Sequence, residues 1–269
     1  YRILSIRNTM NLGLREKVII VTGGAKGIGQ GISESLALES AMVAIVGRNE
    51  EDNQRCIEKI QATGGQAFSF VADLSNPSEC QQVVDKVAKM FGKIDGLVNN
   101  AGLNDGVGLE TGNYEKFIQS INANLTHYYL MAQAVLPYLK KSKGVIVNIG
   151  SKTAETGQGN TSGYAASNGG RNALTREWAL ELRDYNIRVN SVIVAECYTP
   201  MYEKWIETLE NPKEKLASIT SKIPLGQRMT TKEEIGDMVT FLMSPKSSHT
   251  TGQIIHVDGG YVHLDRAIS

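Results

Sequence analysis

The chain has 269 residues, of which 41% are hydrophobic, so it can bury the core of one large α/β domain or of two small ones. Its 28 lysines and arginines balance its 28 aspartates and glutamates, so it lacks the basic excess that nucleic acid or an anionic membrane surface would require. No apolar run reaches membrane-spanning length, and the three cysteines suit a reducing compartment, which favours a cytoplasmic location without nucleic-acid or membrane partners.

Short apolar runs alternate with helix-period segments along the chain, which predicts a doubly wound parallel sheet of about seven strands with helices on both faces. Residues 1–9 are interpreted as an extension, and residues 10–269 as one domain. Helix starts are indicated at 76–78 and 230–233. The predicted strands are 18–22, 42–46, 67–71, 95–99, 144–149, 187–193 and 253–257. A helix with one buried face is predicted from Tyr114, Phe117, Ile118, Ile121, Leu125, Tyr128 and Ala132.

A long stretch without a strand follows residue 196. Ligands of open parallel sheets bind at the carboxyl ends of the strands, so a polar helical excursion at about 196–225 would form a substrate lid. A passive pair of surface helices explains the same pattern. The histidines have no metal-ligand spacing, and no metal site is expected. They are His127, His249, His256 and His263.

The glycine-rich turn after the first predicted strand carries the clearest functional signal. Gly23, Gly27 and Gly29 let the main chain approach a ligand closely, and free amides at the start of the next helix face an anion such as a pyrophosphate. Their spacing, G-x-x-x-G-x-G, differs from the general G-x-G-x-x-G pattern. We predict a dinucleotide site, with a purely structural turn as the alternative.

Several segments together resemble the classical short-chain dehydrogenase/reductase family over residues 14–262. The turn matches the family's TGxxxGxG pattern, residues 99–102 read NNAG, and Tyr164 follows Ser151 at the family's usual interval. The resemblance implies a Rossmann-type fold and a nicotinamide dinucleotide cofactor. The implied cofactor contacts are Gly23, Lys26, Gly27, Ile28, Gly29, Arg48, Asp73, Leu74, Asn100, Ala101, Gly102, Tyr164, Cys197 and Thr199.

The charge near the adenosine end bears on the choice of cofactor. Arg48 stands where NAD-preferring members place an acid, and an arginine accommodates a 2′-phosphate. With Lys26 it favours NADP over NAD, although both could be solvated surface cations.

The resemblance assigns Tyr164 as the catalytic base, Ser151 as the group that orients the substrate hydroxyl, and Asn124 as a relay residue. A tyrosine hydroxyl ordinarily has a pKa of about 10, and the family lowers this with a lysine one helical turn later. Here Asn168 occupies that position. Because asparagine is neutral, we expect weakened activity and a gain of more than about tenfold for Asn168→Lys.

Within the family the chain looks most similar to dehydrogenases of L-fucose and related aldoses. The segments that carry this similarity are NNAGLNDGVGL, SKTAETGQGNTSGY, LTREWA and the terminal HTTG and VDGGYVHLDRA. They imply oxidation of the anomeric carbon of an L-fucose-like sugar to its lactone by a homotetramer. Candidate sugar contacts are Asn104, Asp105, Gln158, Asn160, Glu196 and Trp205.

Two rival functions remain open. A 3-oxoacyl or hydroxysteroid dehydrogenase/reductase would have an apolar substrate cleft. A dinucleotide-binding protein that lost turnover through Asn168 would bind cofactor without catalysis.

Overall fold

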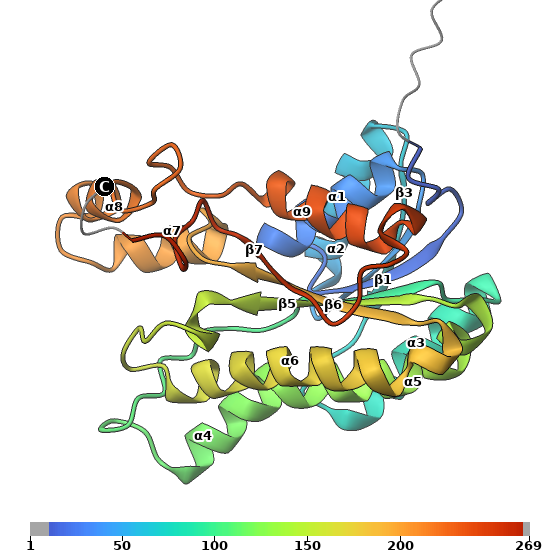
Figure 1. The fold of residues 1–269 in the computed structure, drawn as a ribbon, viewed down its shortest axis with the longest axis horizontal. Coiled ribbons are helices and arrows are strands. Elements are labelled where there is room, and N and C mark those ends of the chain that lie inside the picture. Colours follow the sequence, from blue (N-terminus) through green and yellow to red (C-terminus); the bar gives the residue numbers. More distant parts are fainter. Residues whose placement is uncertain (1–10, 266–269) are drawn as a thin grey trace, which may run out of the picture.

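The computed structural model describes residues 11–265, which form seven parallel strands in the order β3-β2-β1-β4-β5-β6-β7 (Figure 1). The predicted fold class is confirmed, and the predicted strands coincide closely with the observed ones. These are β1 Val18–Thr22, β2 Met42–Gly47, β3 Gln66–Val71, β4 Gly96–Asn99, β5 Val145–Ser151, β6 Arg188–Val194 and β7 Ile254–Val257.

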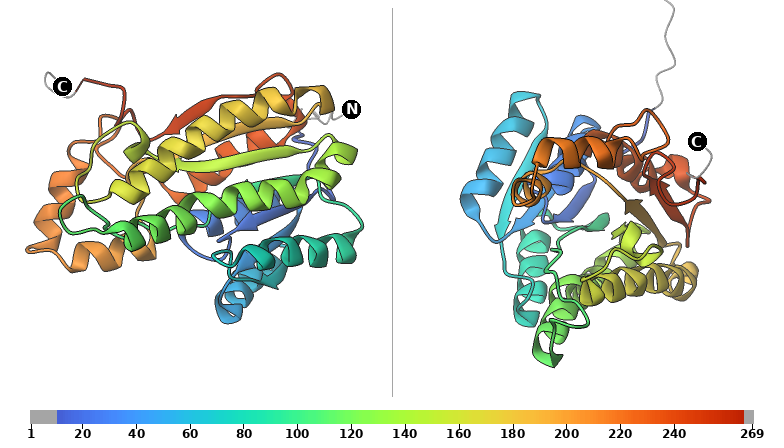
Figure 2. Two further views of the ribbon diagram at one scale, coloured as in Figure 1. Left: turned by 90° about the horizontal axis from the view of Figure 1, so that it is seen from below. Right: turned by 90° about the vertical axis from the view of Figure 1, so that its left-hand side faces the viewer.

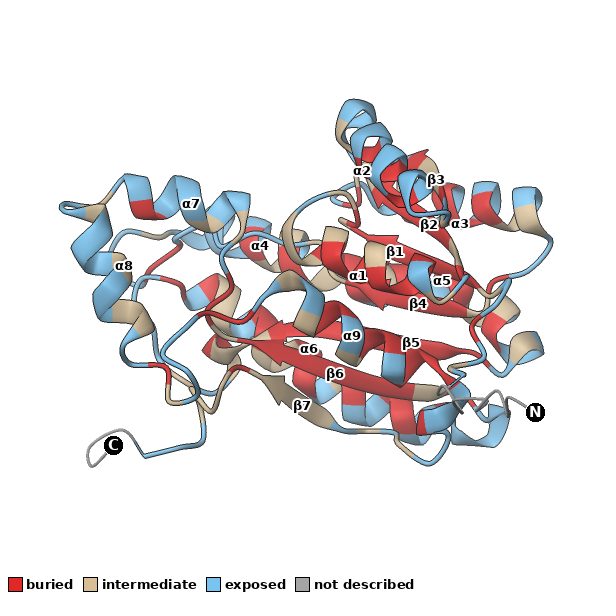
Figure 3. Cartoon of the chain, turned by 90° about the horizontal axis from the view of Figure 1, so that it is seen from above, coloured by how far each residue is buried: buried red, intermediate tan, exposed pale blue. Residues whose placement is uncertain are grey.

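Helices cover both faces of the sheet, because β1, β2, β4, β5 and β6 are apolar on both sides and need two buried layers (Figures 2 and 3). One layer comprises α1 Gly27–Leu38, α2 Glu50–Ala62 and α9 Lys232–Met243. The other comprises α3 Pro77–Phe91, α5 His127–Ser142 and α6 Ser162–Glu181. The predicted starts of α3 and α9 are confirmed by the caps Asn76 and Thr231, whose side chains accept hydrogen bonds from backbone amides.

The predicted helix with one buried face is correct only in part. It divides into α4 Tyr114–Ile121, a π-helical turn Asn122–Thr126, and α5. Tyr128 is fully buried, but Tyr114 is 73% exposed, because α4 packs against α6 away from the sheet (Figure 1). Phe117 is also exposed. The i→i+5 hydrogen bonds of a π-helix add a residue to the turn, which changes the direction in which the side chains of α4 point relative to those of α5.

The excursion predicted after residue 196 forms α7 Pro200–Glu207 and α8 Pro212–Thr220, which lie beyond the carboxyl end of the sheet (Figure 1). Both helices are mostly exposed (Figure 3). The predicted extension at residues 1–9 lies outside the described residues. Within those residues, every helix is too short or too polar to cross a bilayer.

Candidate active site

The glycine turn is tied to the end of β4 by a network centred on Thr22. The Thr22 hydroxyl accepts hydrogen bonds from the backbone amides of Asn100, at 2.9 Å, and Ala101, at 3.1 Å. The Asn100 side chain donates to the carbonyls of Thr22 and Gly23. Because β1 and β4 are neighbours in the sheet, the residues that follow β4 lie next to the turn that follows β1. The NNAG segment thus fixes the shape of the predicted dinucleotide cradle.

Close packing explains two of the glycines. A Cβ atom on Gly29 would lie 2.1 Å from the Gly23 carbonyl oxygen, so no side chain fits there. Gly27 has φ +53, and a Cβ atom on it would lie 3.2 Å from the methyl group of Thr199. Thr199 caps α7 by accepting a hydrogen bond from the Tyr202 amide. The proposed lid therefore begins directly against the cradle.

The predicted adenosine-end residues divide into two groups. Arg48 is exposed at the end of β2. The pKa of Asp73 is lowered chiefly by the hydrogen bonds from Ser75, and the charge of Arg48 lowers it further. Leu74 is buried beside it. Lys26, by contrast, forms an ion pair with Asp52 of α2. Arg48 and Asp73 thus lie together, whereas Lys26 is engaged by an acid of its own.

The three predicted catalytic side chains come from adjoining elements. Ser151 ends β5 and accepts a hydrogen bond from the Thr153 amide, and Tyr164 lies in the first turn of α6. Asn124 is buried in the π-helical turn, where its side-chain oxygen accepts a hydrogen bond from the Leu103 amide at 2.8 Å. Its side-chain amide donates to the Ser120 carbonyl. The Asn124 side chain therefore links α4 to the residue that follows the NNAG segment, and its relay role stays a prediction.

Asn168 is fully buried and turned back along its own helix. Its amide donates to the Tyr164 backbone carbonyl at 2.9 Å, and its oxygen accepts a hydrogen bond from Arg171 at 3.0 Å. A lysine at this position would face the Arg171 guanidinium without an acid between them. The expected gain from Asn168→Lys alone therefore no longer follows.

Arg171 is a functional candidate that the sequence reasoning missed. It is 3% exposed, and its guanidinium donates to the carbonyls of Asn124 at 2.8 Å and Ile149 at 3.1 Å. It also lies 4.2 Å from the centre of the Tyr128 ring. Its remaining nitrogen has no hydrogen-bond partner among residues 11–265 and faces Gly102 of the NNAG loop. The detectable signal was an arginine seven residues after Tyr164, on the same helical face.

Burial and the nearby Arg171 guanidinium lower the pKa of His127 from 6.5 to about 4. Below pH 6.5 the unfolded chain gains a proton at this residue that the folded chain does not bind. We therefore expect the free energy of unfolding to fall by up to about 3 kcal/mol as the pH decreases from about 6.5 to 4. Urea denaturation across this range measures the slope. His127→Phe, which fills the same site without a titrating group, should flatten it, and an unchanged slope would contradict the assignment.

The candidate sugar contacts surround the same end of the sheet. The loops that carry Asn104, Asp105, Gln158 and Asn160 are exposed, and a Cβ atom on Gly108 would lie 3.0 Å from Asn160. The loop after β4 therefore touches the loop before α6. These four side chains lie on loops that the fold brings close to one another.

Glu196 and Trp205 occupy different surroundings. Glu196 is buried in an ion pair with Lys152, the residue after Ser151. Trp205 and Tyr202 of α7 form an aromatic cluster with Tyr198, which precedes the helix. The ring centres of Trp205 and Tyr202 lie 5.1 Å apart, and those of Tyr202 and Tyr198 lie 6.1 Å apart. Burial, followed by the Glu196 charge, raises the pKa of the Tyr202 hydroxyl. Cys197 is buried, and its backbone forms an isolated β-bridge with that of Thr230. Burial raises the pKa of the Cys197 thiol to about 12.

Comparison with known proteins agrees with this geometry. The family model described as enoyl-(acyl carrier protein) reductase matches residues 23–262. A 3-oxoacyl-[acyl-carrier-protein] reductase from Thermotoga maritima is 36% identical over 250 residues, covering 93% of this chain and 99% of the relative. The chain belongs to the short-chain dehydrogenase/reductase family.

Two solved dehydrogenase structures share the fold. The crystal structure of Cj0485 dehydrogenase has 46% sequence identity and a TM-score of 0.91, covering 96% of this chain and 98% of its own. The ligand-free aldohexose dehydrogenase of Thermoplasma acidophilum has 29% identity and a TM-score of 0.84, covering 94% of this chain and 96% of its own. Membership in the family makes this chain an NAD(P)-dependent oxidoreductase.

Proposed function

We propose that the protein oxidises the anomeric carbon of an L-fucose-like aldose to its lactone, with NADP as the preferred cofactor. The observation that carries this proposal is the pairing of polar and aromatic groups next to Ser151. Lys152, the residue after Ser151, forms an ion pair with Glu196, and Glu196 interacts in turn with Tyr202 of the aromatic cluster. A sugar ring needs both polar partners and an apolar face against which to lie.

The residues of this chain divide the proposed chemistry among them. Tyr164 removes the proton of the anomeric hydroxyl as the carbon–hydrogen bond breaks and the lactone carbonyl forms. Ser151 donates to the developing carbonyl oxygen, and Asn124 holds the relay that returns the proton to solvent. A bound nicotinamide supplies the hydride acceptor. Arg48 would contact a 2′-phosphate of the cofactor, whereas the pairing of Lys26 with Asp52 leaves Lys26 a weaker candidate for this contact.

Arg171 is proposed to replace the lysine that the family places at position 168. Its buried guanidinium is joined to Asn168, which also binds the backbone of Tyr164. No carboxylate is among its hydrogen-bonding partners in the described part of the chain, so its positive charge is not neutralised locally. A cation in a water-excluded site stabilises a nearby anion far more than one in solvent does. Arg171 would therefore supply, through Asn168, the positive charge that the family's lysine places near the catalytic tyrosine.

The similarity to a 3-oxoacyl reductase supports a second candidate, the reduction of a 3-oxoacyl group. The exposed apolar side chains Met201, Leu225 and Leu264 are consistent with an acyl chain near the lid. The same catalytic residues would then act in the opposite direction, with Tyr164 as the proton donor.

A substrate panel tests these proposals. We expect kcat/KM for L-fucose to exceed that for 3-oxoacyl thioesters and hydroxysteroids by at least about 100-fold, and NADP to be used in preference to NAD. Initial rates with aldoses, secondary alcohols and 3-oxoacyl thioesters, each with both cofactors, measure the preference. Turnover of the thioester alone would favour the second candidate. Cofactor binding by fluorescence titration without any turnover would indicate a silent dinucleotide-binding protein.

We also propose that residues 196–225 form a lid over the substrate. The proposed assembly is a homotetramer, and the proposed location is the cytoplasm. The exposed aromatic side chains of α4, including Tyr114 and Phe117, support an interface with another copy of the chain.

A further inference from the structure

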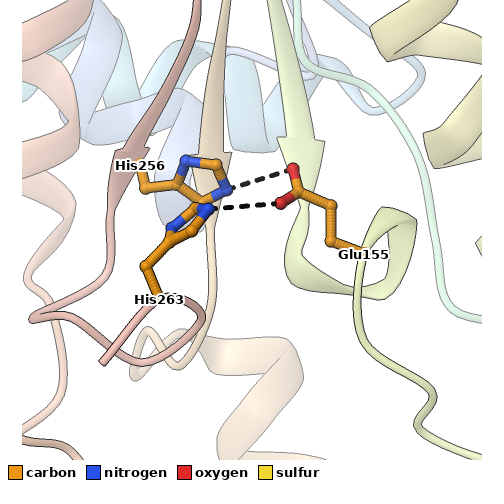
Figure 4. Close-up of side chains that lie close together, drawn as sticks. All are labelled: Glu155, His256 and His263. Carbon is orange, nitrogen blue, oxygen red and sulfur yellow. Dashed lines mark hydrogen bonds and ion pairs between the residues drawn. The ribbon is translucent and has the colours of Figure 1, made fainter. Parts of the chain in front are cut away.

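The fold assembles a cluster of three potential metal ligands outside the proposed catalytic centre (Figure 4). Glu155 follows β5, His256 lies on β7, and His263 lies on the turn after β7. The Nε2 atom of His256 lies 3.1 Å from one carboxylate oxygen of Glu155, and Nε2 of His263 lies 3.7 Å from the other. Figure 4 shows both imidazole rings directed toward this carboxylate.

The distances within the cluster fit a coordinated cation. One ligand atom from each residue lies within 4.8 Å of the other two. Bonds of about 2.0 to 2.2 Å in a tetrahedral arrangement place ligand atoms about 3.4 Å apart. The two imidazole nitrogens lie 3.1 and 3.7 Å from the two oxygens of the Glu155 carboxylate, which is close to this value. The three side chains are therefore near enough to one another to share one ion.

The backbone turn that returns His263 toward His256 is stabilised by a buried acid. The Asp258 carboxylate accepts hydrogen bonds from the amides of Gly260, at 2.8 Å, and Val262, at 3.0 Å. The His256 side chain is only 14% exposed, and the two imidazole rings lie edge to face with centres 4.3 Å apart. The cluster thus has a positioned backbone and one half-buried ligand, and its other two ligands are exposed.

We propose that Glu155, His256 and His263 bind one divalent transition-metal ion, with zinc as the reference ion. Two imidazoles and one carboxylate suit zinc and its neighbours, whereas magnesium and calcium prefer oxygen ligands alone. The histidines lack metal-ligand spacing in the sequence, and for that reason no metal site was expected. The turn after β7 nevertheless brings His256 and His263 together in space.

A bound ion would join segments that are distant in the sequence. Glu155 lies in the loop that follows Ser151, and the same loop contributes Lys152, whose ammonium group lies 4.3 Å from the centre of the Tyr261 ring. The ion would add a second link between this loop and the turn that carries His263. The site is therefore structural, and it fixes the polypeptide next to the proposed catalytic serine.

Zinc binding to chelator-treated protein without a histidine tag tests the proposal. Competition with a chromogenic chelator should give one zinc per chain, and Co²⁺ should produce the visible absorption bands of a low-symmetry site. Zinc should also raise Tm, because it binds the folded chain. His263→Ala should weaken zinc binding at least about tenfold, and this exposed side chain can be removed without disturbing β7.

The matched control is His249→Ala, which removes an exposed histidine outside the cluster. It should leave affinity and stoichiometry unchanged. Glu155→Gln should weaken binding while leaving the circular dichroism spectrum intact. Failure to bind zinc at micromolar concentration, or equal losses in His249→Ala and His263→Ala, would overturn the proposal.

Discussion

Replacing Tyr164 with phenylalanine is expected to lower kcat at least about 1,000-fold, equivalent to about 4 kcal/mol of activation free energy. Phenylalanine retains the ring of this half-buried residue at the start of α6 but removes the phenolic oxygen that would accept the substrate proton. Steady-state rates with the best substrate of the panel measure the effect. The dissociation constant for NADP should change far less than kcat, because only the contact expected of the Tyr164 hydroxyl is lost and those of the glycine turn remain.

The control for this variant is Tyr129→Phe, which removes the hydroxyl of an exposed tyrosine on α5. We expect this variant to retain the full rate. If Tyr164→Phe kept more than a tenth of the activity, another group would have to accept the proton, and the proposed mechanism would be wrong.

Arg171→Leu is expected to lower kcat about 100-fold near neutral pH. Steady-state rates with the best substrate of the panel measure the effect. An exchange of charge between positions 168 and 171 separates an electrostatic role of Arg171 from a packing role.

The partner exchange at position 168 provides a sharper comparison. Asn168→Lys alone adds a second cation beside Arg171 and should destabilise the protein by about 3 kcal/mol, since neither charge has an acidic partner. The double variant Asn168→Lys/Arg171→Leu moves the single charge to the family's usual position and should recover most of the rate lost in Arg171→Leu. A double variant as slow as Arg171→Leu would show that the charge is not the limiting feature.

The sheet was predictable because its strands are buried on both faces and appear as short apolar runs between turn signals. The glycine turn was predictable because its shape requires particular residues at fixed spacing. The Gly23 carbonyl, for example, leaves no space for a side chain on Gly29. These features depend on residues close together in the sequence or on regular spacing.

The features that were missed depend on contacts between distant segments. The role of Arg171 becomes apparent only when the π-helical turn brings the Asn124 carbonyl to its guanidinium. Likewise, Glu155 and His256 are 101 residues apart and meet because β5 and β7 flank β6. The exposed position of Tyr114 also escaped the helical pattern, because that pattern assumed one continuous helix across the π-helical turn.

The hydrogen bond between Thr22 and Asn100 has a consequence for the synthesis of the chain. These residues are 78 positions apart, and β1 acquires its second neighbour only when β4 has been made. At about 5 to 20 residues per second, translation leaves one edge of β1 without a neighbour for several seconds. During that interval the nascent chain presents an apolar strand edge with which other chains can pair, so aggregation competes with folding.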